Sequence, residues 1–369
     1  MGSGRQARVT IADVARHLGV TKSTVSRALN GYPDIAEGTR LRISRAAEAL
    51  GYRPLSHAQA IRTGRTRSIG LVLQIDSEDS ARPFLADFIA GVTQAASDAT
   101  WTVTIAAEPT EEKVRSTVGR LIEERKADGF ILPRTLCSDP RVELLRDQDV
   151  PFIMFGRTED SRGCAWFDIQ GEDAMSGAVA RLAALGHTRI AHIPGGPQYF
   201  YSQLRIDGFQ KGLSDAGLPF SPDLIGAPAM TRNSGARVAH DLLTQATPPT
   251  AIVCAVDRAA LGVYEAASEL GLTVGQDVSL MAYDGLPEGA YATPGLTTYA
   301  VDSFAAGSRL AEMLIQLIRG ADPEELRELA PPTLVERGSD RPPSLTPAEL
   351  AQRVIDHHSK QPVQWEDNQ

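Results

Sequence analysis

The chain has 369 residues, of which 42% are hydrophobic and 22% are charged, and this composition is typical of a soluble globular protein with two or three domains. No apolar run reaches the roughly 18 residues that a membrane-spanning helix needs. The N-terminal stretch MGSGRQARVT has basic side chains but no apolar core after them, so we expect no signal peptide and a cytoplasmic protein.

The formal charge of −9 is distributed unevenly along the chain. Residues 1–67 contain 12 Lys or Arg and 4 Asp or Glu, whereas the remaining 302 residues contain 25 and 42. A basic segment on an acidic body indicates that a polyanion such as DNA binds to the small segment only. The alternative, a basic tail without structure, is disfavoured by the helical pattern of the same segment.

Catalytic and metal-binding signatures are absent from the sequence. Cys137, Cys164 and Cys254 lie far apart, each in or beside an apolar run, so we expect buried reduced thiols. The seven histidines show no His-Glu-x-x-His spacing, and neither G-x-S-x-G nor a phosphate-binding loop occurs. The acidic and histidine run at 356–358 lies in a polar stretch without a further ligand. We therefore expect no metal, no cofactor and no enzymatic activity.

Residues 9–51 show the pattern of three short helices. Thr10 and Asp13 have the spacing of a capping box before an apolar stripe that ends at Gly19. Thr21 is expected to cap a second helix, which ends near residues 30–31. A third helix is predicted from about residue 37 to residue 50, and its inward side chains are predicted to be Leu41, Ile43, Ala46, Ala47 and Leu50. A helix, a tight turn with glycine and a second helix form a helix-turn-helix unit.

From Ser68 onward, apolar strand patterns alternate with amphipathic helix patterns. Such alternation predicts parallel sheets covered by helices on both faces, and the length predicts two lobes. The predicted strands are 69–75, 102–106, 129–132, 152–155, 189–193, 251–255 and 279–283, and the predicted helices are 87–99, 111–126, 172–185 and 259–270. The last thirty residues are Pro-rich and then carry one short helix pattern at 348–357, so we expect a partly ordered tail.

The stretch from Val9 to Pro54, and above all GVTKSTVSRALN at 19–30, resembles the DNA-binding head of the LacI/GalR repressor family. The resemblance continues through RTGRTRSIGLVL and the body to about Gly338. It implies an α/β protein with an all-α helix-turn-helix head and a two-lobed periplasmic-binding-protein-like body with parallel sheets. The implied domains are 1–54, a hinge at 55–67, a sensor at 68–338 and a tail at 339–369. Within the sensor, the implied lobes are about 68–165 with 300–330, and 166–299 with 331–338.

The resemblance also implies which head residues contact DNA. The second helix enters the major groove by its N-terminal end. By resemblance, Lys22, Ser23 and Arg27 face base edges, and an arginine can pair with guanine through two hydrogen bonds. Phosphates and the adjoining backbone are contacted by Thr24, Ser26 and Asn30, and the predicted DNA-binding set also includes Thr10, Thr21 and Tyr52. The alternative for these side chains is an ordinary solvated helix face.

Two positions depart from the family pattern. Ala36 stands where the family usually has the capping Ser or Asn of the third helix, so Asp34 is a candidate for that cap. In the segment that resembles the hinge helix, Ile61 stands where the family has a leucine that wedges into the minor groove. The alternative for this segment is a flexible linker.

The resemblance of the body to the family's sensor implies a small-molecule site between the lobes, at the carboxyl ends of the strands. Arg205 in R-x-x-G-F and Asp284 in MAYDG match the family most clearly. Several Asp, Arg and aromatic side chains suit the hydroxyls and apolar faces of a sugar. The full set of predicted ligand contacts is Phe84, Arg134, Arg157, Tyr201, Gln203, Arg205, Asp257, Asp284 and Asp302.

Other roles are open for some of these side chains. Asp257 could instead cap the helix that follows it. Arg134 and Arg157 could form salt bridges at the rim, and Asp302 could be structural. The two tryptophans at 101 and 166 are expected in the core or in hinge packing.

The resulting prediction is a repressor of carbohydrate-utilisation genes that binds a palindromic operator as a homodimer and that a sugar-like ligand releases. The C-terminal segment offers Leu350 and Val354 but no sustained heptads, which favours a dimer over a tetramer. The alternatives are a sugar-binding transport protein, and an activator or a co-repressor-dependent regulator with a non-sugar ligand. An enzyme is a further alternative, and an assay for turnover of bound sugar would distinguish an enzyme from a sensor.

Overall fold

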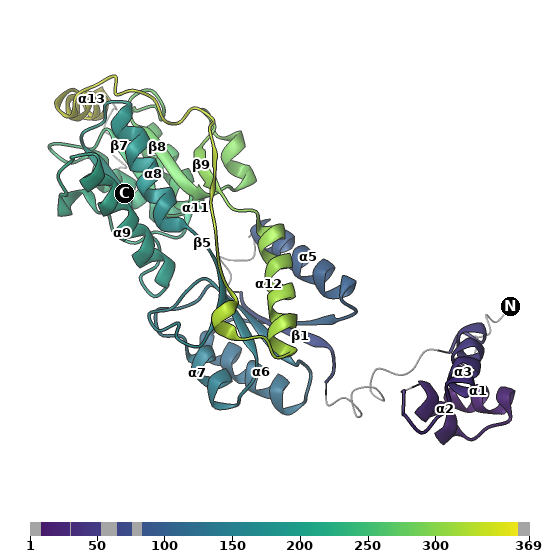
Figure 1. The fold of residues 1–369 in the computed structure, drawn as a ribbon. Helices are drawn as coiled ribbons and strands as arrows, with labels where there is room; N and C mark the ends of the chain where they lie inside the picture. The colour runs from purple at the N-terminus through teal and green to yellow at the C-terminus, as the bar shows by residue number, and fades with distance from the viewer. Residues whose placement is uncertain (1–8, 30, 53–64, 76–82, 361–369) are drawn as a thin grey trace, which may run out of the picture. The chain divides into compact units, whose positions relative to one another are not determined.

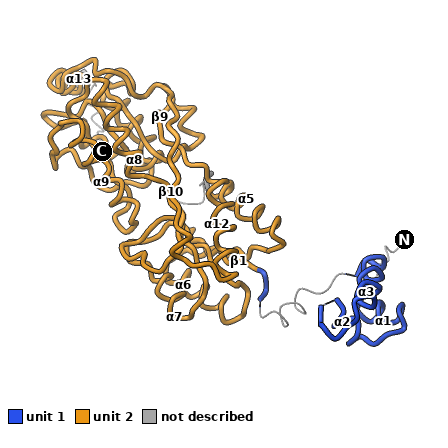
Figure 2. The backbone as a smooth tube through the Cα atoms, viewed as in Figure 1, with its two compact units in different colours: residues 1–67 blue, residues 68–369 orange. Residues whose placement is uncertain are grey.

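The computed structural model describes residues 9–29, 31–52, 65–75 and 83–360. The chain forms two compact units, residues 1–67 and 68–369, which we call the head and the body (Figure 2). The body begins at Ser68, where the alternation of strand and helix patterns starts in the sequence.

The described part of the head contains the three predicted helices, α1 (Ile11–Leu18), α2 (Lys22–Leu29) and α3 (Glu37–Ala49). The carboxylate of Asp13 accepts hydrogen bonds from the backbone N–H of Thr10 (2.9 Å) and from its hydroxyl (2.7 Å), so this pair holds the start of α1. Gly19 ends α1 with a left-handed φ of 68°. The buried core consists of Val14, Ala15, Val25, Ala28, Ile43 and Ala47.

Two sequence predictions about α3 are wrong. Leu41 was expected inside, yet it is 53% exposed. It lies two residues from the buried Ile43, which turns it about 200° around the helix, so both side chains cannot face the core. Asp34 was a candidate cap, but the residue that precedes α3 is Ala36, which makes no side-chain cap. Asp34 forms an ion pair with Arg27 instead.

The first lobe of the body is built on a six-stranded parallel sheet with the order β10-β5-β4-β3-β1-β2. Nearly continuous apolar runs in β1, β3 and β4 are buried, as expected for a sheet covered on both faces. The strands are β1 (Ser68–Gln74), β2 (Thr102–Glu108), β3 (Gly129–Pro133), β4 (Phe152–Phe155), β5 (Ala165–Ile169) and β10 (Arg327–Ala330), and the helices are α5 (Pro83–Asp98), α6 (Glu111–Glu123), α7 (Pro140–Asp147) and α12 (Ser303–Ile318).

The second lobe is built on a five-stranded sheet with the order β11-β9-β8-β7-β6, in which only β11 is antiparallel to its neighbour. Its strands are β6 (Ile190–Ile193), β7 (Ala251–Cys254), β8 (Ser279–Asp284), β9 (Thr297–Ala300) and β11 (Thr333–Val335). Its helices are α8 (Gly171–Ala184), α9 (Phe200–Asp215), α10 (Arg232–Leu243), α11 (Asp257–Glu269) and α13 (Pro347–Lys360). Short 3₁₀ turns occupy Pro222–Leu224 and Pro287–Tyr291 here, and Pro323–Glu325 before β10.

The chain passes between the two lobes after β5, after β9 and after β10. Strand β5 pairs with β4 and with β10, so it belongs to the first lobe, whereas the sequence prediction ended that stretch at about residue 165. The seven predicted strands and the four predicted body helices are present, while β5, β9, β10, β11, α7, α9, α10 and α12 were not predicted.

Helices α5 and α12 pack side by side on the first sheet (Figure 1). Their backbones approach so closely that a Cβ at Gly91 would lie 2.0 Å from the carbonyl oxygen of Phe304, and a Cβ at Gly307 would lie 2.3 Å from that of Phe88. Trp101 is buried in the core next to these helices, as expected. Cys164 and Cys254 are buried free thiols, whereas Cys137 is only half-buried.

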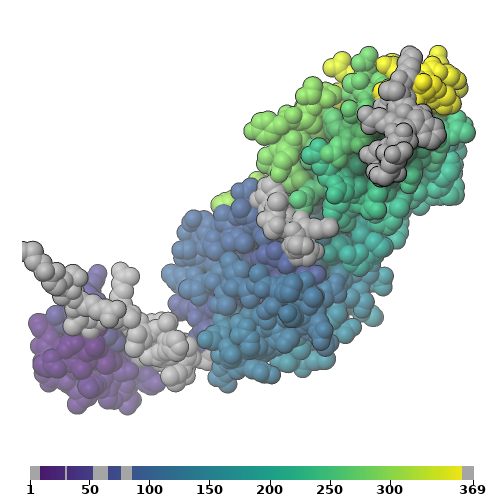
Figure 3. Space-filling model, turned by 180° about the vertical axis from the view of Figure 1, so that it is seen from behind, coloured from purple at the N-terminus to yellow at the C-terminus, as the bar shows by residue number. Residues whose placement is uncertain are grey.

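The C-terminal segment was expected to be a partly ordered tail with one short helix at 348–357. The helix is present as α13, but residues 339–360 pack on the second lobe. Ser339 has no exposed surface, and its hydroxyl donates to the carbonyl of Leu280 in β8 (2.6 Å). Helix α13 then packs against the second lobe, where Leu350 and Val354 are buried in the lobe's hydrophobic cluster. Figure 3 shows this last helix in yellow on the green surface of the second lobe.

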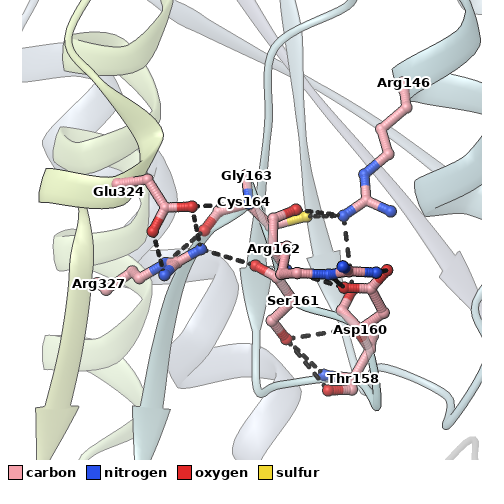
Figure 4. A network of polar contacts seen from close by, with 9 residues as sticks. All are labelled: Arg146, Thr158, Asp160, Ser161, Arg162, Gly163, Cys164, Glu324 and Arg327. Atoms are coloured by element: carbon pink, nitrogen blue, oxygen red, sulfur yellow. Dashed lines mark hydrogen bonds and ion pairs between the residues drawn. The ribbon is translucent and has the colours of Figure 1, made fainter.

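A polar network fixes the loop between β4 and β5 (Figure 4). Arg146 of α7 donates to the carbonyl of Arg162 (2.6 Å) and to the sulfur of Cys164 (3.0 Å). From the other side, Arg327 of β10 donates to the carbonyls of Cys164 (3.0 Å) and Ser161 (2.8 Å). The network joins the edge strand β10 to the rest of the first lobe.

Candidate ligand-binding site and DNA-binding surface

The N-terminal end of α2 is an exposed polar surface. The hydroxyl of Thr21 accepts a hydrogen bond from the backbone N–H of Thr24 (3.1 Å), so Thr21 caps α2 as predicted. Lys22 and Ser23 are exposed in the first turn, and Arg27 is exposed one turn later, while Val25 on the opposite face is buried. The amphipathic spacing of α2 therefore directs three of the predicted DNA contacts to solvent.

Arg27 is held in place before any DNA is present. A nitrogen of its guanidinium lies 2.5 Å from a carboxylate oxygen of Asp34, and the guanidinium lies over the ring of Tyr32, 5.2 Å from its centre. The Arg27 and Asp34 side chains keep 46% and 49% of their surface exposed, so this ion pair is worth at most about 1 kcal/mol. It can orient the arginine without preventing it from reaching a base.

The other predicted head contacts are distributed around this surface. Thr10 is exposed at the start of α1, whereas Ser26 is half-buried. Tyr52 packs against the head core, and burial raises the pKa of its hydroxyl above the usual range. Asn30 and Ile61 lie outside the described residues.

The body contains a cavity of about 180 Å³ between the lobes, which we call the first cavity. It is lined from the first lobe by the ends of β3, β4 and β5, and from the second lobe by the end of β8 and the first turns of α9. Carboxyl ends of parallel strands from both sheets thus converge on one space, which is where α/β proteins bind small ligands. Four predicted contacts line it, namely Arg134, Tyr201, Arg205 and Asp284.

Arg205 is the central donor of the first cavity. Only 8% of the residue is exposed, and its guanidinium lies 3.7 Å from the ring centre of Tyr283 and 4.5 Å from that of Tyr201. One terminal nitrogen donates to the carbonyl of Ala255 (2.5 Å). Its Nε is buried and has no hydrogen-bond partner among the described residues. The Nε faces Gly171 of α8, where a Cβ would lie 3.2 Å from it.

The R-x-x-G-F motif explains how α9 brings Arg205 to the cavity. A Cβ at Gly208 would lie 2.2 Å from the backbone carbonyl of Glu172, so only glycine allows α9 to approach α8 this closely. Phe209 has no exposed surface, and its ring stacks on His192 at 4.8 Å. These two contacts fix the axial rotation of α9, with Arg205 directed at the strand ends.

Asp284 faces the same cavity as a potential acceptor. It ends β8 with a φ of +133°, a strained conformation for a residue with a side chain. Burial raises the pKa of its carboxyl to about 7, while the charge of Arg205 opposes that rise. Burial therefore favours the protonated form of Asp284, and the positive charge of Arg205 favours the ionised form.

Asp257 does not line the first cavity and does not cap α11. It has no exposed surface, and its carboxylate accepts from the backbone N–H of Leu286 (2.7 Å) and the hydroxyl of Thr298 (2.6 Å). Burial raises the pKa of this carboxyl to about 6. The residue before α11 is Val256. Asp257 thus supports the loop after Asp284, and it does not stand among the residues that line the cavity, where the sequence placed it.

Arg157 forms the salt bridges that the sequence left open as its alternative role. It donates to Asp168 of β5 (2.7 Å) and to Glu172 of α8 (2.8 Å), and so it spans the first crossing between the lobes. Its guanidinium also lies 5.8 Å from the ring centre of Trp166. Asp168 lines the first cavity, and burial raises the pKa of its carboxyl. The sequence analysis missed Asp168 because it did not predict β5.

The remaining predicted contacts lie elsewhere. The amide of Gln203 donates to Asp207 (2.8 Å) on the exposed face of α9. The carboxylate of Asp302 accepts from the backbone N–H of Ala305 (2.8 Å) and caps α12. Phe84 belongs to α5, but its side chain is outside the described part of the structure. The cavity also contains residues that sequence reasoning did not select, among them Phe155, Met230, Arg258 and Tyr283.

Two negative findings apply to the described residues. Within them, no helix is both long and apolar enough to cross a membrane. The same residues contain no cluster of three or more His, Cys, Asp or Glu side chains that could hold a metal ion.

A helix-turn-helix head with an exposed polar recognition helix, joined to a two-lobed body whose cavity is lined by apolar surface and a few charged side chains, defines a DNA-binding regulator with a ligand sensor. Residues 10–55 match the family described as bacterial regulatory proteins of the lacI family, and residues 179–339 match the periplasmic binding protein-like domain. The chain belongs to the LacI family of transcriptional regulators.

Relatives and solved structures agree with this assignment. The chain is 34% identical to the transcriptional regulator AglR of Rhizobium meliloti (strain 1021), over 90% of this chain and 95% of AglR. It is 30% identical to RafR of Escherichia coli, over 86% of this chain and 95% of RafR. Among solved structures, the lac repressor dimer bound to operator and the anti-inducer ONPF matches with a TM-score of 0.74 and 25% identity, covering 90% of this chain and 99% of that one. The regulator CelR in complex with cellobiose matches with a TM-score of 0.70 and 27% identity, covering 90% of this chain and all of CelR.

Proposed function

We propose that this regulator represses carbohydrate-utilisation genes in the cytoplasm, has no enzymatic activity, and releases a palindromic operator when a sugar fills the first cavity. The observation that carries the proposal is that Arg205 and Asp284 line the same cavity between the lobes, beside the rings of Tyr201 and Tyr283. A sugar hydroxyl can accept from the guanidinium of Arg205 and donate to the carboxyl of Asp284, and the neighbouring rings of Tyr201 and Tyr283 can pack on the apolar face of the sugar. The cellobiose bound to CelR supports a sugar as the class of ligand.

On this proposal, Arg205→Ala and Asp284→Asn remove the response to sugar and leave operator binding intact. Loss of one partner from a buried charged hydrogen bond costs about 1.5–3 kcal/mol, which weakens sugar binding tenfold or more. Gln203→Ala is the matched control, because Gln203 lies on the exposed face of the same helix, paired with Asp207. If both cavity variants still release operator at wild-type sugar concentrations while their folds are intact, the ligand site is elsewhere.

The regulatory part of the proposal has its own test. If sugar lowers operator affinity by some factor, operator must lower sugar affinity by the same factor. Titrating sugar into the free protein and into its operator complex measures both sides of this equality. Equal sugar affinities in the two titrations would show that the two sites are uncoupled.

A further inference from the structure

The basic head has few acidic side chains, and one of them lies beside the exposed surface of α2. Residues 1–67 contain 12 Lys or Arg but only four Asp or Glu, namely Asp13, Asp34, Glu37 and Glu48. Asp13 holds the start of α1 through Thr10, and Glu37 stands in the first turn of α3, where the helix dipole favours a negative charge. Asp34 caps no helix, and it pairs instead with Arg27 of α2.

Main-chain contacts bring Asp34 to Arg27. Gly31 follows α2 with a left-handed φ of 70°, and the backbone N–H of Tyr32 donates to the carbonyl of Arg27 (3.1 Å). The backbone N–H of Ile35 then donates to the carbonyl of Tyr32 (3.2 Å), and Ile35 packs against the head core. The turn is therefore tied to α2 at one end and to the core at the other, so the fold itself sets the position of Asp34.

The same turn supplies two groups that hold the guanidinium of Arg27. The Asp34 carboxylate lies 2.5 Å from one of its nitrogens, and the ring centre of Tyr32 lies 5.2 Å from it. An arginine loses rotamer freedom when it docks on a base, and an arginine that is already held loses less. The guanidinium has five N–H donors, of which a bidentate carboxylate engages two, so donors remain for O6 and N7 of a guanine.

We propose that Asp34 is a positioning residue for operator recognition, which holds Arg27 in the orientation that reads a base and so raises the preference for operator over other DNA. The inference goes beyond the sugar response of the proposed function and does not depend on it. It rests on Arg27 as a reader of bases, which the exposed end of α2 supports.

The Asp34 carboxylate has opposite effects on the two kinds of DNA. Binding to random DNA comes from the phosphates, which attract basic side chains and repel a carboxylate. There Asp34 weakens binding, both by its own charge and by keeping Arg27 from the phosphates. At the correct base, Asp34 instead reduces the entropy that Arg27 loses on docking. One carboxylate therefore raises the ratio of operator affinity to random-DNA affinity, and this ratio is the specificity.

The test measures the affinity of the full-length protein for two DNA duplexes, with no sugar present. One duplex carries the sequence that the wild-type protein selects from a random library, and the other carries the same bases in scrambled order. The readout is the ratio of the two affinities, in which an unfolded fraction of a variant cancels. The variants are Asp34→Asn, Arg27→Ala and the two combined. Glu48→Gln is the matched control, because Glu48 is an exposed carboxylate of α3 in the same head.

Asp34→Asn should raise the affinity for the scrambled duplex and lower the ratio. A half-exposed ion pair shifts an equilibrium by up to about fivefold, so the two heads of a dimer should lower the ratio by up to about 25-fold. Selection repeated with Asp34→Asn should lose preference at the same base position as selection with Arg27→Ala. Adding Asp34→Asn to Arg27→Ala should leave the ratio as it is in Arg27→Ala alone, and Glu48→Gln should keep the wild-type ratio.

Three results would overturn the inference. An unchanged ratio in Asp34→Asn would mean that the carboxylate acts on DNA only as a charge. A ratio that falls by the same factor with and without Arg27 would mean that Asp34 contacts DNA itself. An unchanged ratio in Arg27→Ala would mean that Arg27 reads no base and that Asp34 has nothing to position. The proposed sugar response stands or falls separately, because no sugar enters this assay.

Discussion

Replacing Leu350 by alanine tests whether helix α13 belongs to the folded body. Leu350 has no exposed surface and shares a buried cluster with Leu270 and Val274 of the second lobe. A buried Leu→Ala substitution lowers the free energy of unfolding by about 2–5 kcal/mol. Because α13 lies at the edge of the lobe, it can move inward and fill part of the cavity that the substitution leaves. We therefore expect a loss of about 2–3 kcal/mol. For a domain of this size, each kcal/mol lowers Tm by about 2–4 °C, which gives a decrease of about 4–12 °C.

The assay is differential scanning calorimetry of the full chain, with the body transition as the readout. Ile355→Ala is the control, because Ile355 lies on the same helix and is 56% exposed, so its truncation should leave Tm within about 1 °C. Equal transitions for wild type and Leu350→Ala would show that α13 is detached in solution, and the expectation of a tail would then hold after all. A lower Tm for both variants would mean that each substitution destabilises helix α13 itself, rather than removing the buried contact of Leu350.

Three other predictions concern the head, the cavity and the assembly. Arg27→Ala should weaken binding to operator by about 1–3 kcal/mol and lower the preference for operator over random DNA, and equal losses on both DNAs would make Arg27 a phosphate contact. Burial raises the pKa of Asp284 from 3.8 to about 7, so its contribution to stability is full below pH 3.8 and is lost as pH rises to about 7. The Tm of Asp284→Asn should therefore rise relative to wild type between pH 4.5 and pH 7.5, and a constant difference would contradict the shift. The apolar face of α13 packs on its own lobe, so this helix is not available to join two dimers into a tetramer. Light scattering at micromolar concentration should therefore give a dimer, and a tetramer would refute this.

The fold could be predicted wherever apolar periodicity was strong. Strands β1, β3, β4, β7 and β8 are continuous apolar runs with both faces buried, and each was found within two residues of its ends. Strands β9 and β10, with the sequences TTYA and RELA, are short and polar, and only their pairing with neighbours makes them strands. Helix α9 buries Ser202, Arg205, Gly208 and Gly212 beside only two large apolar side chains, Phe209 and Leu213, so its apolar stripe is too short to recognise.

The site could be predicted in part, for the same physical reason. Asp284 and Arg134 follow strands, and the carboxyl ends of parallel strands converge, so this rule placed them correctly at the cavity. The same rule failed for Asp257, whose side chain turns beneath a loop to satisfy a backbone N–H. On α9, Tyr201 and Arg205 are four residues apart and share a face, whereas Gln203 lies between them and faces solvent. Sequence proximity to a motif was a poor guide where helical rotation decides the direction of a side chain.

The state of Asp284 links sugar binding to protons. Burial and the charge of Asp257 raise the pKa of its carboxyl to about 7, while the charge of Arg205 lowers it. A sugar hydroxyl donates a stronger hydrogen bond to the ionised carboxylate than to the neutral acid, so the bound ligand must lower this pKa. Sugar affinity should then rise between pH 6 and pH 8, with protons released on binding, and Asp284→Asn should abolish both effects. Titration calorimetry at pH 7 in two buffers with different enthalpies of ionisation measures the released protons, and identical apparent enthalpies in the two buffers would refute this role for Asp284.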